Sequence, residues 1–205
     1  MAMTDTEARH DTLAAALWPS QGWLSDMNGV LRATLLAVAG SLLLYASAKV
    51  QVPFYPVPIT MQTFAVLVIG MAYGWRLGGA TVAFYLAQGA VGLPVFAGTP
   101  EKGLGLAYMA GPTGGYLLGF LLAAVAVGWL AGRGWDRSVV KTLAAMTLGT
   151  AIIFVPGVLY LGALIGWDKP VLDFGLYPFL WGAVFKIGLA AAVLPLAWKA
   201  VSRRG

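Results

Sequence analysis

The 205-residue sequence contains no cysteine, and its one histidine, His10, lies in a polar N-terminal stretch. The absence of cysteine excludes disulfide bonds, thiolate metal sites and cysteine nucleophiles. The apolar runs hold no H-E-x-x-H motif, no metal-ligating cluster and no pair of carboxylates. The glycine-rich stretch Gly111–Tyr116 lacks the lysine of a phosphate-binding loop. We therefore expect no metal, no cofactor, no enzymatic activity and no ATP hydrolysis by this chain itself.

Charge is also scarce. Charged residues make up 10% of the chain, whereas a soluble domain carries about 25%. Hydrophobic residues make up 60%, and the mean hydropathy is +0.80. These values indicate an integral membrane protein, and the length suits one membrane domain. The net charge of +5 does not indicate nucleic-acid binding, because the arginines cluster at the ends of the apolar runs.

The apolar runs predict an all-α membrane protein with six transmembrane helices. About 20 apolar residues cross a bilayer, and short polar or glycine-containing breaks separate the runs. The predicted helices are Val30–Ala48, Ile59–Tyr73, Gly78–Val91, Pro112–Leu130, Val140–Ile165 and Tyr177–Val201.

The positive charges predict the orientation of these helices. Cytoplasmic loops carry an excess of lysine and arginine. With the N-terminus inside, the outer loops keep only Lys49, Lys102 and Lys169. Both termini are then cytoplasmic, and the three longest loops lie outside. The inner ends collect the other positive residues, namely Arg9, Arg32, Arg76, Arg133, Arg137, Lys141, Lys199, Arg203 and Arg204.

The segment Lys49–Phe64, between the first two helices, is the most unusual part of the chain. It carries Pro53, Pro56 and Pro58 within six residues. Each proline fixes φ, removes a backbone donor and disfavours helix at the preceding residue. Non-helical backbone at membrane depth is tolerated where it packs on protein or lines a cavity. We expect an extended, proline-rich lid over a pocket that opens outward.

Lys186 is the main polar anomaly, because it lies near the middle of the sixth predicted helix. A charge at that depth costs about 2.5–3.5 kcal/mol on insertion scales, so an intramembrane lysine suggests a functional site. Snorkelling to an interface, or a structural bond to helix carbonyls, is the alternative. Gln88, Gln62 and Thr63 are polar residues that either bind a ligand or form hydrogen bonds between helices.

Small residues recur at four-residue spacing on the first predicted helix, at Ala33 and Ala37. Such a stripe lets another helix approach closely. It serves either packing within the chain or the docking of a partner helix near the inner surface.

Three motifs, in this order, resemble the BioY family of biotin-binding S components from energy-coupling-factor (ECF) vitamin transporters. They are KVQVPFYPVPITMQT at residues 49–63, GLPVFAG at 92–98 and GPTGGYLLGF at 111–120. The resemblance implies six membrane helices and capture of biotin from outside. It also implies a partner module made of a transmembrane coupling protein and two ABC-type ATPases. The A-x-x-x-A pattern, which serves S components in docking to that module, matches Ala33 and Ala37.

The sixth helix departs from the family pattern P-F-x-x-G-D-x-x-K, in which the aspartate and the lysine contact biotin. Lys186 is kept, but Ala183 replaces the aspartate. We expect Gln88 and Lys186 to face the ureido group of biotin, with Gln62 and Thr63 turned inward as well. Lys102, or less favourably Lys49, would pair with the carboxylate near the mouth. The aromatic residues expected around the fused rings are Phe54, Tyr55, Phe84, Tyr85 and Phe96.

The sequence thus divides into a cytoplasmic tail with an interfacial segment, residues 1–29, and a six-helix substrate-binding domain, residues 30–205. We expect a multi-pass protein of the cell membrane that takes up biotin with the help of separate ATPases. An S component for another small vitamin is one alternative, which Ala183 favours. The other is a membrane interaction protein without a ligand, in which Lys186 only bonds carbonyls.

Overall fold

The computed structural model describes residues 12–17 and 28–202. Most of the predicted tail, residues 1–11 and 18–27, lies outside the described residues. The remaining chain is mostly helical, which confirms the all-α class. In chain order its elements are α1 (Leu13–Leu17), α2 (Gly29–Lys49), β1 (Gln51–Val52), β2 (Ile59–Thr60), α3 (Gln62–Ala90), α4 (Gly105–Met109), α5 (Gly114–Ala131), the 3-10 helix η1 (Trp135–Arg137), α6 (Val139–Ile165), α7 (Val171–Gly175) and α8 (Tyr177–Ser202).

Within this described part, five helical segments are long and apolar enough to cross a membrane, where the sequence predicts six. The difference lies in α3, which is divided at Gly74 into two arms. Gly74 has φ 78° and ψ 172°, a conformation that glycine adopts without steric cost. A Cβ added at Gly78 would lie 3.0 Å from the Cα of Gly70, so the two arms run close together. The predicted turn between helices two and three is thus a reversal at one residue.

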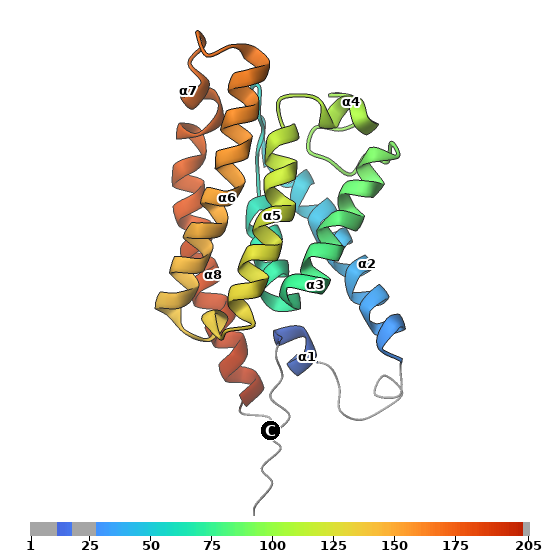
Figure 1. Cartoon of the computed structure of the whole chain (residues 1–205), viewed down its shortest axis with the longest axis vertical. Coiled ribbons are helices and arrows are strands. Elements are labelled where there is room, and N and C mark those ends of the chain that lie inside the picture. The colour runs from blue at the N-terminus through green and yellow to red at the C-terminus, as the bar shows by residue number, and fades with distance from the viewer. Residues whose placement is uncertain (1–11, 18–27, 203–205) are drawn as a thin grey trace, which may run out of the picture.

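The elements at the two ends of the bundle differ in kind (Figure 1). The β1–β2 hairpin, α4 and α7 gather at one end, here called the loop end. The Gly74 turn, η1, α1 and the C-terminal end of α8 lie at the other end. The α3–α5 connection, which contains α4, and the α6–α8 connection, which contains α7, therefore lie at the same end as the proline-rich segment. The alternating direction of the predicted helices requires this arrangement.

The centre of the bundle is α5, which packs against α3 on one side and α6 on the other through glycines. A Cβ at Gly119 would lie 2.8 Å from the Cα of Ile153 on α6. A Cβ at Gly128 would lie 2.5 Å from the backbone nitrogen of Trp75, at the start of the second α3 arm. Because glycine has no side chain, these backbones can approach closely, which favours helix association in lipid.

In contrast, α2 crosses the second arm of α3 and has little other contact with the bundle (Figure 1). A Cβ at Gly40 would lie 2.6 Å from Thr81 Cγ2, and Ser41 donates a hydrogen bond to Gln88. Ala33 and Ala37 share the helical face of Gly40 but are only half-buried. The N-terminal part of α2 therefore extends beyond its main contact with α3.

At the end opposite the loops, η1 is fixed to α8. Asp136 is fully buried, and its Oδ2 accepts a hydrogen bond from Trp198 Nε1. Burial raises the pKa of the Asp136 carboxyl, although the Trp198 bond acts in the opposite direction. Thr142 Oγ1 also donates to Trp135 O, at 2.9 Å. This connection holds the α5–α6 turn against the C-terminal part of the chain.

The close contact at Gly128 yields a stability prediction. Gly128→Ala should lower the free energy of unfolding by about 1–3 kcal/mol, because the added methyl meets the backbone of the Gly74 turn. Gly188→Ala is the matched control, since a Cβ there has no atom within 4 Å. Thermal unfolding in detergent measures both, and equal midpoints would contradict the tight packing of α5 on α3.

Candidate functional site

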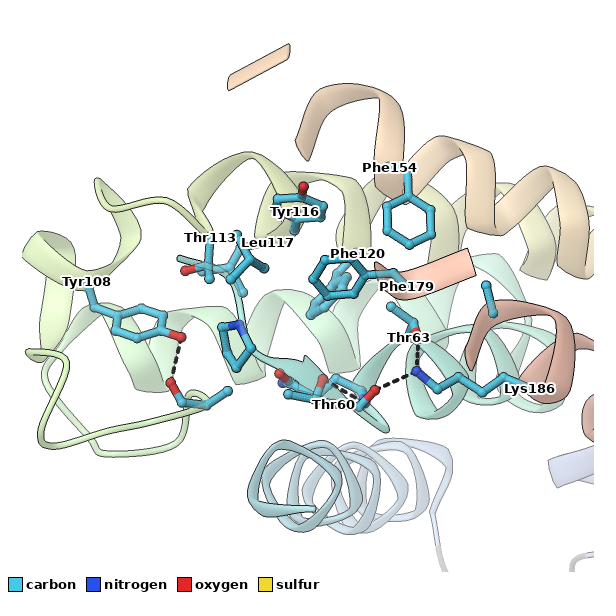
Figure 2. Close-up of a pocket in the computed structure, with 15 residues that line it drawn as sticks. Thr60, Thr63, Tyr108, Thr113, Tyr116, Leu117, Phe120, Phe154, Phe179 and Lys186 are labelled. Atoms are coloured by element: carbon cyan, nitrogen blue, oxygen red, sulfur yellow. Dashed lines mark hydrogen bonds between the residues drawn. The ribbon is translucent and has the colours of Figure 1, made fainter. Parts of the chain in front are cut away.

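A cavity lies at the loop end, between the proline-rich segment, the start of α3 and helices α5, α6 and α8. Its volume is about 550 Å³, counting the open mouth. Tyr108 and Lys186 stand at opposite ends of it in Figure 2. The lining residues are Val57, Pro58, Thr60, Gln62, Thr63, Ala97, Tyr108, Thr113, Tyr116, Leu117, Phe120, Phe154, Phe179, Ala183 and Lys186.

Aromatic rings form one wall of the cavity. Phe179 of α8 packs against Phe154 of α6 with ring centroids 5.9 Å apart, and against Tyr116 of α5 at 6.4 Å. Phe54 contacts Phe179 edge-on, at 6.3 Å, and is not itself part of the lining. The Tyr116 hydroxyl donates to Gly175 O at 2.7 Å, which holds α7 over this wall. The wall therefore suits a compact apolar group.

The lid is a short antiparallel hairpin in which Gln51 pairs with Thr60 and Val52 with Ile59. Pro56, Val57 and Pro58 are buried at its tip, whereas the Tyr55 side chain is 83% exposed. The sequence predicts an extended segment; residues 51–52 and 59–60 are strands, residues 55–57 form a bend, and Val57 and Pro58 line the cavity. The segment thus acts as a wall of the cavity rather than as a solvated loop.

Lys186 crosses from α8 to the base of this lid. Its Nζ donates to Thr60 O at 2.6 Å and to Thr63 Oγ1 at 3.1 Å (Figure 2). No carboxylate among residues 12–17 and 28–202 forms a salt bridge with it. An ammonium carries three donors, so one N–H remains for a ligand. Ala183, one turn before Lys186, lines the same cavity.

The hydrogen bonds of Tyr85 fix the orientation of the Gln62 amide. The Tyr85 hydroxyl donates to Val95 O at 2.8 Å, so it must accept from the Gln62 amide. Gln62 Nε2 lies 2.7 Å from that hydroxyl. The amide nitrogen therefore faces Tyr85, and the carbonyl Oε1 is left as an acceptor on the cavity side, where Gln62 is a lining residue.

The family is shown by comparison with known proteins. A family model described as "BioY family" matches residues 16–203. The chain belongs to the BioY family. A relative from Thermotoga maritima, named biotin transporter BioY, is 37% identical over 151 residues, covering 74% of this chain and 86% of that protein. A Rhizobium etli protein of the same name is 34% identical over 175 residues, covering 82% and 91%.

One solved structure has the same fold as this BioY chain. It is described as the S-component for biotin from an ECF-type ABC transporter. The TM-score is 0.71 at 21% sequence identity, over 84% of this chain and 95% of that one. The likeness confirms an S-component architecture.

Several residues predicted for the BioY site lie behind the cavity rather than in its lining. Tyr85 and Phe96 are buried, and Phe96 stacks on Tyr108 with ring centroids 4.9 Å apart. Gln88 accepts the hydrogen bond from Ser41, which matches the alternative of a bond between helices. Phe84 and Tyr55 are exposed, outside the lining.

The two lysines predicted to lie near the cavity mouth also have distinct positions. Lys49 Nζ donates to Thr99 O at 3.0 Å, to Thr99 Oγ1 at 3.2 Å and to Phe96 O at 3.3 Å. It therefore connects the end of α2 to the loop before α4. Lys102 is exposed, and its aliphatic stem lies against Gly98. Neither lysine is in the cavity lining.

Other lining residues were not predicted from the sequence. Thr113 and Tyr116 lie within the third BioY motif, so the motif itself was a signal for them. Phe179 follows Pro178 in the pattern that contains Lys186, and Tyr108 precedes the third motif. Phe154 is an aromatic residue in a uniformly apolar helix, where nothing in the sequence distinguishes a cavity position from lipid contact.

Tyr85→Phe tests the hydrogen-bond chain behind the cavity. The change leaves the buried Gln62 amide and Val95 O without their partner, and it should cost about 1–3 kcal/mol of unfolding free energy. Tyr55→Phe removes a hydroxyl from an exposed ring and should leave the thermal midpoint unchanged. If both variants unfold at the wild-type temperature, the Tyr85 hydroxyl does not fix Gln62.

Proposed function

We propose that this chain is the substrate-binding S component of an ECF-type transporter and that its ligand is biotin. The observation that carries the proposal is Lys186, a membrane-embedded cation without a carboxylate partner in the described structure, which lies in an aromatic-walled cavity. The names of the BioY relatives and of the solved structure support the same ligand.

The polar groups of the cavity complement the ureido group of biotin. This group presents one carbonyl acceptor and two N–H donors on a compact apolar ring system. The remaining N–H of Lys186 would donate to the carbonyl, and Gln62 Oε1 would accept from one N–H. Thr63 orients the ammonium, while Phe179 and Tyr116 would contact the rings. Gln62 thus supplies an acceptor where Ala183 has replaced the aspartate of the family pattern.

The carboxylate of biotin would lie nearest to water, at the mouth. Ala97 lines the cavity, and its neighbour Gly98 contacts the Lys102 stem. Lys102 is therefore the better candidate for pairing with the carboxylate. Lys49 already donates to three acceptors and would need to release them. We retain Phe54, Tyr55, Tyr85, Phe96 and Gln88 as proposed contributors, acting through the lid and the cavity wall.

The loop end faces the outside in this proposal, and both termini are cytoplasmic. The support is the charge asymmetry of the sequence, because the loop-end connections keep only Lys49, Lys102 and Lys169. Biotin would thus enter from outside. The chain has no phosphate-binding loop, so a coupling protein and ABC-type ATPases would provide the energy for uptake.

Titration of the purified protein with biotin tests the ligand. Binding should occur at micromolar concentrations or below, and a panel of other small vitamins distinguishes the alternative that Ala183 favours. Lys186→Met removes a charged donor and should lower the affinity for biotin about ten- to a hundredfold. Lys169→Met, in the exposed α6–α7 connection, should not change affinity. Absence of biotin binding by the wild-type protein would refute the proposed function.

Docking to the coupling module is proposed to involve Ala33 and Ala37. Ala33→Trp and Ala37→Trp should prevent co-purification of the module while biotin affinity remains unchanged. Leu35→Trp is the control, because Leu35 lies between them in sequence, on the opposite side of α2, and is exposed. If Ala33→Trp and Ala37→Trp instead lower biotin affinity or thermal stability, the role of Ala33 and Ala37 is packing on α3.

A further inference from the structure

Lys186 separates two cavities. Besides the outer cavity, a smaller pocket, here called the chamber, lies between α3, α6 and α8. Thr63, Ala183 and Lys186 line both, so the two spaces meet at these residues. The other lining residues of the chamber are Phe64, Leu67, Met146, Thr150 and Ile187.

Thr150 is the polar residue that belongs to this chamber alone. Threonines within helices commonly bond a carbonyl one turn earlier, as Thr147 does with Leu143 O at 2.9 Å and Thr81 with Leu77 O at 2.7 Å. In the described structure, Thr150 Oγ1 has no such partner, nor any other side-chain hydrogen bond. Thr63 and Lys186 bond each other and the other lining residues are apolar, so the Thr150 hydroxyl is available to a ligand.

We propose that Thr150 is a further binding residue. From its position in the inner chamber, its hydroxyl oxygen accepts a hydrogen bond from the second ureido N–H of biotin. The inference rests on the proposed function. Gln62 belongs to the outer cavity, Thr150 to the inner chamber, and Lys186 lies where they meet. In this order the three groups would offer an acceptor, a donor and an acceptor, which complements the donor–acceptor–donor edge of a cyclic urea.

Ala183 makes this arrangement possible. It lines both spaces beside Lys186, and its side chain is a single methyl group. An aspartate at the same position would place a carboxylate there and supply the acceptor. In this chain the acceptor role is divided between Gln62 and Thr150, on two other helices. The site then reads the ureido edge with neutral acceptors around one cation.

The test measures biotin affinity of Thr150→Val, which keeps the side-chain shape and removes the hydroxyl. Affinity should fall about tenfold, because an N–H of the bound ligand loses its acceptor. Thr150→Leu, which fills the chamber with apolar atoms, should lower the affinity for biotin as well. Thr150→Ser keeps the hydroxyl and should bind biotin nearly as tightly as the wild type.

Thr147→Val is the matched control, one turn away on α6, where the exposed hydroxyl bonds only its own helix. Its biotin affinity should equal that of the wild type. Unchanged affinity in Thr150→Val, or an equal loss in Thr147→Val, would overturn the proposal while biotin remains the ligand. If the wild-type protein does not bind biotin, the proposed function fails instead. The two failures are therefore distinguishable.

Discussion

The ammonium of Lys186 is the constraint on which the loop end of this BioY chain depends. A charge within a membrane helix is expensive unless polar groups surround it. Here they come from the lid, through Thr60 O, and from the first turn of α3, through Thr63 Oγ1, and not from an acidic side chain of the described structure. Because the lid backbone is the partner of the charge, its position relative to α8 is fixed. The proline-rich segment and the cavity are thus organised by one cation.

The glycine contacts make much of the bundle closely packed. Gly119 allows α5 to lie directly on α6, and Gly128 allows it to lie on the Gly74 turn, at the end opposite the loops. Nearer the lid, α5 and α6 still meet closely at Gly115, but the rings of Tyr116, Phe154 and Phe179 lie between α5, α6 and α8, and α3 begins only at Gln62. The non-helical segment occupies part of the gap above this first arm. The cavity is what the rings and the lid leave open.

Much of this arrangement could be predicted from the sequence, because a few residues conflict with their surroundings. The prolines at 53, 56 and 58 indicate the extended lid, and Lys186 and Gln62 are polar residues in apolar runs. Gln88 has the same local pattern, yet it bonds Ser41, since spacing does not reveal which helix lies opposite. Thr150 and Phe154 are ordinary residues of a membrane helix. Their contribution depends on three-dimensional proximity, which no local pattern encodes.

The reversal at Gly74 has a consequence for biosynthesis. The first arm of α3, residues 62–73, is about 18 Å long, whereas the hydrocarbon core measures about 30 Å. That arm is too short to partition into the bilayer as an independent span. It requires the second arm, which the close approach at Gly70 and Gly78 makes its immediate partner. The membrane-insertion machinery would therefore have to accommodate the segment from the lid to Ala90 as one helical hairpin.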